Sequence, residues 1–457
     1  MKKIHIALAS LFFIGLVSCS NDSLDPTIID KKDITANPIV DANDLRLVVN
    51  GAYKYMSGVS YYGRDYVLYN EVHSDNALSN GNSGRFVAES AFTTVVSSAL
   101  ASDTWATIYK VIAEANIAIA APLTGTEADA IKAEAYALRA LAHFDLMKLY
   151  GQQNVTQSLE SLTVPYVTIY GTATAENSYR LTYKELQAKV YEDINTALGL
   201  VNANSTESKI NITEQAMYAL KARFALYFAA YAGDAEYDVA LEASEKALSL
   251  GGKVANAEEF VSIFKSGELG VNSIFEIQFL DNDNLGINSL YQLYNETAYG
   301  DIIVTDELKN NVFANTTDIR SKMITLDTKK VIRNTGKYVD RANNVKIIRV
   351  EEMVLTAAEA AFRKGDTAKA LTLVNSIVVN RGLPAYTNVT LDIIINERHK
   401  ELAFEGFRFD DLMRLKRGIP TIKARTITPA YGDNVLAFPI PQAETNVSPI
   451  EQNLGYR

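Results

Sequence analysis

The chain has 457 residues, of which 48% are hydrophobic and 21% charged, a composition typical of a globular protein with a sizeable core. Its formal net charge is −10, so electrostatics disfavour a nucleic-acid partner. Tyrosine is abundant, with 25 residues beside a single tryptophan. A ring that carries a hydroxyl suits amphipathic ligands as well as half-buried packing.

The first residues have the pattern of a bacterial lipoprotein signal. A basic start leads into the apolar stretch Ile4–Val17, which is too short to span a bilayer. The sequence Leu-Val-Ser-Cys that follows resembles a lipobox, with Cys19, the only cysteine, as the lipidated residue. We therefore expect a signal peptide at 1–18 and a lipidated, flexible tether at 19–42. Acylation of Cys19 would leave no thiol for a disulfide, a metal site or redox chemistry.

Helical periodicity predominates from residue 43 onwards. The segment 103–120 begins at Asp103, a plausible N-cap, and repeats apolar residues at three- and four-residue steps. The alanine-rich segment 127–151 has the same periodicity and stops at Gly151, as helices often stop at glycine. Together they predict a helix pair near 101–151.

Two later segments share one pattern, a helix, a Gly-Asp turn and a second helix. In the first copy Ala240 and Ala247 lie seven apart, where a tetratricopeptide repeat has small residues, but the second copy has Ile377 where an alanine is expected. Helix pairs of this type bury their apolar faces only against stacked neighbours. We expect a mainly α fold, a tetratricopeptide-like stack of helix pairs near 101–151, 183–250 and 351–382.

Two regions do not follow the helical pattern and are expected to be rich in loops. Residues 58–100 are rich in Gly, Asn and Ser, and residues 251–350 interrupt the repeats with "NSIFEIQF", a predicted strand, and a polar, tyrosine-rich segment. We expect this insertion to carry a few short strands. Irregular segments on a rigid scaffold are common places for ligand sites.

The stretch "ERHKELAFEGFRFDDL" near the C-terminus places three glutamates four residues apart, Glu397, Glu401 and Glu405. Such carboxylates can serve a hydrolase as acid and base, or they can be salt-bridged. Along one side of a helix they would repel each other unless cations neutralised them. Five cations are available nearby: Arg398, Lys400, Arg408, Arg414 and Arg417. A continuous helix supplies neither separated loop carboxylates nor a sugar cleft, so we favour a structural salt-bridge cluster over an active site.

The same stretch resembles the signature E-R-x-x-E-L-x-x-E-G-x-R-x-x-D-L-x-R of the SusD/RagB family of surface lipoproteins. The segments "WATIYKVIAEAN", "AEAYALRALAHFDLMKLYG", "FPIPQAE" and "QNLGY" resemble further family motifs in the same order. Departures are Phe407, where the family often has His, Asp410, where it often has an aromatic residue, and Leu454, which replaces a proline. The resemblance implies one domain at 43–457 with a C-terminal signature at 395–457. It assigns structural roles to Trp105, Arg139, Asp145, Glu397, Arg398, Glu401, Glu405, Arg408, Asp411 and Arg414.

The resemblance also implies a function. It implies a non-catalytic lipoprotein, anchored in the outer membrane and facing the cell exterior, that captures an oligosaccharide for a SusC-like TonB-dependent transporter. A peptide ligand, as in the RagB branch, stays open, and a secreted glycosidase or a scaffold for periplasmic assembly is less favoured. No cofactor or metal is implied, because the calcium-loop-like "DNDNLG" has Leu285 at a ligand position and Gln292 in place of the closing glutamate.

Ligand-binding residues are expected on the loops outside the repeats. Sugars stack on aromatic rings, and their hydroxyls pair with carboxylates, amides and arginines. By the family pattern of an early Asp-Asn loop, the first loop region nominates Asp75, Asn76, Arg85 and Phe86. The insertion nominates Tyr291, Tyr294 and Tyr299, for each of which plain loop packing is the alternative.

Replacing Cys19 with Ala should release the protein from the membrane. Even one acyl chain anchors a protein weakly, and the variant would carry none. The measurement is the fraction that sediments with outer membranes, in cells that lack the partner transporter, with the wild type as control. An alanine variant that sediments as fully as the wild type would contradict the lipobox interpretation.

Overall fold

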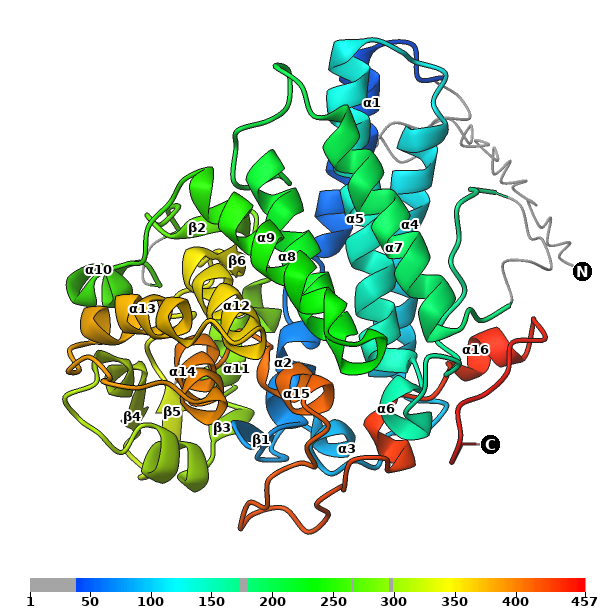
Figure 1. Cartoon of the computed structure of the whole chain (residues 1–457). Coiled ribbons are helices and arrows are strands. Elements are labelled where there is room, and N and C mark those ends of the chain that lie inside the picture. The colour runs from blue at the N-terminus through cyan, green and yellow to red at the C-terminus, as the bar shows by residue number, and fades with distance from the viewer. Residues whose placement is uncertain (1–37, 172–178, 265–266, 296–298, 457) are drawn as a thin grey trace, which may run out of the picture.

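The structure, a computed structural model, describes residues 38–171, 179–264, 267–295 and 299–456 (Figure 1). The signal peptide, Cys19 and most of the predicted tether lie outside the described residues. The first helix, α1 (Ala42–Met56), is capped by the Asp41 side chain, which accepts from Asp44 N. Helix α1 therefore begins directly after its capping residue.

The chain folds mainly into helices, as the periodicity predicts (Figure 1). The long ones after α1 are α4 (Ala99–Ala120), α5 (Thr126–Tyr150), α7 (Tyr183–Leu200), α8 (Glu214–Ala232), α9 (Ala235–Ser249), α12 (Val350–Arg363), α13 (Thr367–Val378) and α14 (Leu391–Leu402). The shorter ones are α2 (Asp65–Val72), α3 (Val87–Ser90), α6 (Gln153–Thr156), α10 (Ala257–Ser262), α11 (Leu290–Tyr294), α15 (Arg408–Arg414) and α16 (Gln442–Thr445).

Neighbouring helices in the sequence pack side by side and form a stack. Helix α5 packs between α4 and α7, α8 packs on α9, and α12 joins α9 to α13 and α14. The mainly α stack with short strands is thus confirmed. Helix α4 starts earlier than expected, because Ser98 caps it by accepting from Ala101 N, and Asp103 lies inside its first turns.

Small side chains allow close packing around α5. Its alanines at 133, 135, 137, 140 and 142 are completely buried, and neighbouring helices cover it on most sides. Leucine or phenylalanine at these positions would hold the flanking helices apart. The alanine-rich composition of this segment is therefore a packing feature.

The strands lie in the two regions that interrupt the helical pattern. Within the described residues they form three two-stranded antiparallel sheets. The pairs are β1 (Ala77–Ser79) with β3 (Ile302–Val304), β2 (Ser273–Ile277) with β6 (Val345–Arg349), and β4 (Ile324–Leu326) with β5 (Ile332–Asn334). The predicted strand in "NSIFEIQF" is β2. The β1–β3 pair joins the early loop region to the insertion, with Leu78 opposite Ile303.

The early region 58–100 is less loop-like than its composition indicates. Helix α2 lies inside this region, and every one of its side chains is buried. The polar composition of region 58–100 predicted a loop. In the structure, polar side chains of this region form internal hydrogen bonds; Asn76, for example, donates to Glu71. The surface loop is shorter than predicted and follows β1.

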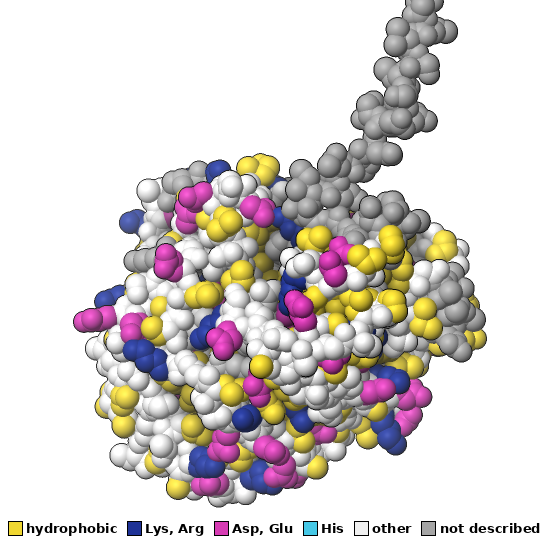
Figure 2. All heavy atoms as spheres, turned by 90° about the horizontal axis from the view of Figure 1, so that it is seen from above, with side chains coloured by type: hydrophobic (Ala, Val, Ile, Leu, Met, Phe, Trp, Pro, Cys, Tyr) yellow, Lys and Arg dark blue, Asp and Glu magenta, His cyan; other side chains and the backbone are white. Residues whose placement is uncertain are grey.

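The C-terminal segment closes the fold by returning to the end of α5. Phe438 N donates to Leu149 O at 2.8 Å, and Asn453 Nδ2 donates to Tyr150 O at 2.8 Å. Arg180 Nη2 donates to Asn453 Oδ1 at 2.7 Å. On the face that Figure 2 shows, acidic and basic side chains are interspersed, without one broad patch of a single sign.

Enlarging a buried alanine of α5 should destabilise the fold. Ala137→Leu should lower the free energy of unfolding by about 1–3 kcal/mol, because the flanking helices have no room for the added carbons. The matched control is Ala235→Leu at the exposed start of α9, which should change it by about 0.5 kcal/mol or less. Urea unfolding measures both, and equal effects would contradict the close packing around α5.

Candidate functional site

The loop that follows β1 lies against the segment that precedes β3. Asn80 N donates to Asp301 O at 2.8 Å, and its side-chain amide donates to Gly300 O at 2.7 Å. The Ser83 hydroxyl donates to Asp301 Oδ2 at 2.7 Å. Gly81 and Gly84 both have positive φ, which lets the short loop turn back on itself. Two segments far apart in the sequence are thereby fixed next to each other.

Two of the nominated ligand residues meet at this junction. The Arg85 guanidinium lies 4.5 Å from the centroid of the Tyr299 ring, and Tyr299 is 43% exposed. Arg85 Nη1 is 3.6 Å from Asp301 Oδ2, and its Nη2 is 3.5 Å from Asn288 Oδ1. Arg64 Nη1 also donates to Asn288 Oδ1, at 3.0 Å. We name the set Arg85, Asn288, Tyr299 and Asp301 the Arg85–Tyr299 platform.

The platform combines the groups that a polyhydroxylated ligand requires. An exposed aromatic ring can stack on a face of C–H bonds, while the guanidinium donates and the amide and carboxylate oxygens accept hydrogen bonds. Arg85 Nη1 and Asp301 Oδ1 are also buried without a hydrogen-bond partner among the described residues. If Arg85 moved aside, a ligand hydroxyl could satisfy both, since it donates and accepts.

Three other nominated residues are buried, which corrects their assignment as surface ligand contacts. Asn76 and Phe86 have no exposed area and Tyr294 has 1%. Asn76 lies between Glu71 and His399, and bonds His399 Nε2 through its Oδ1 at 2.6 Å. The backbone folds these side chains into the core, a fact that their position in a polar sequence did not reveal.

The remaining two nominated residues also have internal contacts. Asp75 receives two hydrogen bonds from Arg408, at 2.7 and 3.0 Å. Burial alone would raise the pKa of Asp75, but the charges of His399 and Arg408 lower it. Tyr291 is half-buried beside a small cavity that Tyr338 and Arg341 also line. Arg408 thus fixes the base of the first loop instead of neutralising the C-terminal glutamates.

The glutamates of the C-terminal signature do not all lie on one helix. Helix α14 ends at Leu402, and Glu405 follows in a turn where Phe404 has φ 71° and Gly406 has φ 82°. This turn swings Glu405 away from the helical row that its spacing predicts. Glu397 and Glu401 have no exposed area, and Glu405 has 7%.

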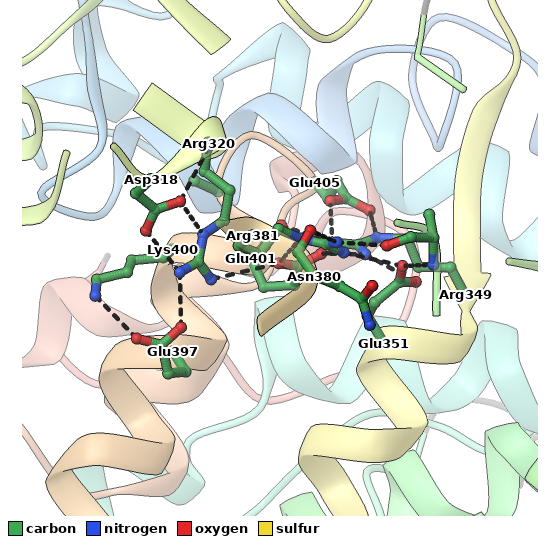
Figure 3. Close-up of polar contacts among 12 residues, drawn as sticks. Asp318, Arg320, Arg349, Glu351, Asn380, Arg381, Glu397, Lys400, Glu401 and Glu405 are labelled. Atoms are coloured by element: carbon green, nitrogen blue, oxygen red, sulfur yellow. Dashed lines mark hydrogen bonds and ion pairs between the residues drawn. The ribbon is translucent and has the colours of Figure 1, made fainter. Parts of the chain in front are cut away.

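Arginines from distant segments neutralise these glutamates (Figure 3). Glu401 accepts from Arg381 at 2.8 and 2.9 Å and from Arg349 at 2.7 Å. Glu405 accepts from Arg349 and Lys337, and Glu397 accepts from Arg320 at 2.7 Å. We call this set the glutamate–arginine cluster: Glu397, Glu401, Glu405, Arg320, Lys337, Arg349 and Arg381.

Of the five cations nominated from the sequence, only Lys400 bonds a glutamate of the cluster. It donates to Glu397 at 2.9 Å. Arg398 and Arg414 both bond Asp411, and Arg414 also bonds Glu359. Arg417 reaches Asp392 at the surface. Sequence proximity was therefore a poor guide to charge pairing, because the fold places cations of the insertion, and Arg381 after α13, against these glutamates.

The other residues of the family signature are buried too. Arg139 donates to Asp193 at 2.6 and 2.7 Å, and Asp145 accepts from three tyrosine hydroxyls at 2.6 to 2.8 Å. Trp105 is 3% exposed and packs on Tyr109 and Tyr150. Each of these side chains makes its hydrogen bonds or packing contacts inside the protein.

The electrostatics of the cluster do not suit acid catalysis. Burial alone would raise the pKa of Glu401, but the guanidinium charges of Arg381 and Arg349 hold it well below its usual range. A general acid needs a proton at the working pH, which a carboxyl with a strongly lowered pKa does not carry. The cluster fits a structural role.

Glu71 differs from these glutamates because it forms no ion pair with any described residue. It is completely buried and accepts from Asn76 Nδ2 and Gly406 N, both at 2.8 Å. Burial raises its pKa to about 7. It connects α2 to the turn that carries Glu405.

The described residues show neither a metal-binding cluster nor a membrane-spanning helix. No group of three or more His, Cys, Asp or Glu side chains in the described parts of the chain could hold a metal ion. Nor does any described helix combine the length and hydropathy of a membrane span.

Family profiles match both halves of the chain. A profile described as "Starch-binding associating with outer membrane" matches residues 19–226, and that of the SusD family matches residues 222–456. The chain belongs to the SusD family. It is therefore a member of a family of nutrient-binding proteins that associate with the outer membrane.

Relatives align over nearly the whole SusD-family chain. SusD-like protein P2 of Formosa agariphila is 24% identical over 522 aligned positions that span both chains completely. A SusD superfamily protein from Bacteroides vulgatus is 27% identical with a TM-score of 0.82, covering 91% of this chain and 99% of its own. One from Bacteroides thetaiotaomicron is 25% identical with a TM-score of 0.80, covering 91% and 100%.

Removing the central carboxylate should destabilise the protein. Glu401→Ala should lower the free energy of unfolding by about 3–5 kcal/mol, because buried guanidinium groups lose their counter-charge. Asp392→Ala on the same helix breaks only an exposed pair with Arg417 and should cost about 1 kcal/mol or less. Urea unfolding of both variants provides the test, and an unchanged Glu401→Ala protein would contradict the structural role of the cluster.

Glu71 should make stability depend on pH near neutrality. Its folded-state pKa of about 7 exceeds the usual value, so its stabilising contribution is complete below about pH 4 and is lost as the pH rises through 7. Glu71→Gln keeps the shape of the neutral acid and should gain stability relative to the wild type between pH 5 and pH 8. Unfolding free energies of both proteins across this range measure the gain. If the difference in unfolding free energy between Glu71→Gln and the wild type did not vary with pH, the raised pKa of Glu71 would be disproved.

Proposed function

We propose that this protein is a non-catalytic, lipid-anchored outer-membrane protein that captures an oligosaccharide and passes it to a SusC-like TonB-dependent transporter. The observation that carries the ligand assignment is the Arg85–Tyr299 platform. It sets an exposed ring, a guanidinium and hydrogen-bond acceptors on loops outside the helix stack. The family profile of starch-binding proteins that associate with the outer membrane agrees with this choice.

The carboxylates support binding over hydrolysis. A glycosidase needs two carboxyl groups on either side of a sugar bond, one of which holds a proton. In the glutamate–arginine cluster, buried cations pair with the glutamates. Asp301, on the platform, already accepts from Ser83.

A peptide is the second candidate ligand. The platform's guanidinium and aromatic ring could hold a peptide carboxylate and side chain. The neighbouring charges disfavour it, however, because Asp301 lies beside Arg85 and already compensates its charge. A neutral hydroxylated ligand matches this pairing better than an anionic one.

The tether and the anchor would let the protein act as a lid on its transporter. Lipidated Cys19 and the following segment would hold it near the extracellular mouth of the barrel. A ligand that contacts both proteins would bind the closed pair more tightly than either half, and would shift the population towards closure. No catalytic residue is needed in such a cycle.

Loss of the platform ring should weaken ligand binding without unfolding the protein. A glycan and peptide array first identifies the ligand, and calorimetric titration then compares variants. Tyr299→Ala should raise the Kd by up to roughly tenfold, since an aromatic contact contributes about 0.5–1.5 kcal/mol. Tyr170→Ala removes a comparably exposed tyrosine from another loop and should not change the Kd. Equal affinity of the Tyr299→Ala variant and the wild type would reject the platform as the ligand site.

The partner and the absence of catalysis have their own tests. An affinity tag on the protein should recover a large barrel protein from outer membranes of cells grown on the nutrient. Recovery without any barrel protein would reject the lid arrangement. Appearance of cleavage products when the purified protein is incubated with its glycan would reject a purely binding role.

A further inference from the structure

A second cavity lies on the helix stack, away from the platform. It has a volume of about 450 Å³, within the usual range for small-molecule sites. The loop between α7 and α8, the first turn of α8 and Leu250 after α9 line it. None of its lining residues belongs to the Arg85–Tyr299 platform. It is therefore a separate candidate site.

The wall of this cavity contains a hydrogen-bond acceptor in a fixed orientation. Gln215 is 7% exposed, and its Nε2 donates to Ala247 O at 2.9 Å and to Gly251 O at 2.6 Å. Both amide hydrogens form hydrogen bonds, so the side-chain amide cannot flip without breaking these two bonds. Its Oε1 accepts no hydrogen bond from any described residue. It is preorganised to accept from an N–H or O–H group of a ligand.

Charges of both signs line the same cavity: Lys209, Glu214 and the exposed Glu207. Lys209 is half-buried, and neither an ion pair nor a hydrogen bond connects its ammonium to a described residue. Burial lowers the pKa of Lys209, an effect that the charge of Glu276 offsets only in part. Glu214, in the first turn of α8, likewise has no ion pair within the described part of the chain.

An apolar surface borders these groups. Leu250 lines the cavity and is 38% exposed, and Val201 lines it as well. A ligand that fills the cavity would cover both and desolvate the charges. A neutral ligand would leave those charges unpaired, at a cost in binding free energy. A ligand with one charge of each sign would pair the half-buried Lys209 and Glu214, while the exposed Glu207 would keep its contact with water.

We propose that this cavity binds a small zwitterion, a dipeptide or amino acid with an apolar side chain. Its carboxylate would pair with Lys209, and its ammonium group with Glu214 and Gln215 Oε1. Its side chain would rest on Leu250. The site is independent of the platform and holds whether or not the platform binds a glycan.

The experiment uses glycyl-leucine as the probe and the mature lipoprotein in detergent. Calorimetric titration should give saturable binding of glycyl-leucine and none of N-acetyl-glycyl-leucine amide, which has a similar shape but no charges. Lys209→Met and the isosteric Glu214→Gln should each weaken binding about tenfold or more, because each removes one charge pair. Lys253→Met, at an exposed lysine that pairs with Glu259 outside the cavity, should leave the affinity unchanged.

Thermal melts of each variant separate lost binding from lost folding, and Glu214→Gln serves if Lys209→Met does not fold. Tyr299→Ala should bind glycyl-leucine like the wild type, so a failed platform and a failed cavity give different results. Three outcomes would overturn the proposal: no saturable binding of glycyl-leucine, equal binding of the uncharged analogue, or binding that neither charge variant weakens.

Discussion

The double ion pair between Glu401 and the arginines Arg349 and Arg381 is the contact on which the architecture depends. It joins α14 to strand β6 and to the end of α13, and Glu405 continues it towards Lys337 in the insertion. Buried ion pairs contribute little net stability compared with apolar packing, but they are costly to mismatch. We infer that the cluster specifies how the insertion sits on the helix stack. The insertion carries three of the four platform residues, Asn288, Tyr299 and Asp301, so this arrangement also places Tyr299.

The periodic parts of the fold were predictable from the sequence because local rules govern them. Apolar spacing, the alanines of α5 and the Gly-Asp turns each act within a few residues. The salt-bridge interpretation of the glutamate stretch rested on another local rule, that like charges on a helix need neutralisation. Its partners were not predictable. Arg320, Arg349 and Arg381 gave no signal that linked them to Glu401, because only the tertiary fold makes them neighbours.

The predicted ligand-binding residues show a similar limit: the sequence did not separate buried polar side chains from exposed ones. The family pattern of an early Asp-Asn loop nominated Asn76 and Arg85 on equal grounds, yet one is buried and the other lies beside the exposed Tyr299. What separates them is the short strand β1, after which the chain leaves the core. The buried helix α2, with its polar side chains, was the least predictable element, since partners of those side chains come from distant segments: Tyr66 donates to Asp145, and Glu71 accepts from Gly406 N.

The pairing of β1 with β3 has a consequence for how such a protein can change its specificity. Arg85 and Tyr299 come from separate parts of the gene, yet three residue pairs of one short ladder set their spacing. Exchanging one loop with that of a homologue would replace the residues on one side of the binding surface only. The new residues would then face a segment that does not match them. New specificities would therefore arise most readily by point substitutions on either side of the ladder, or by recombination that carries both segments together.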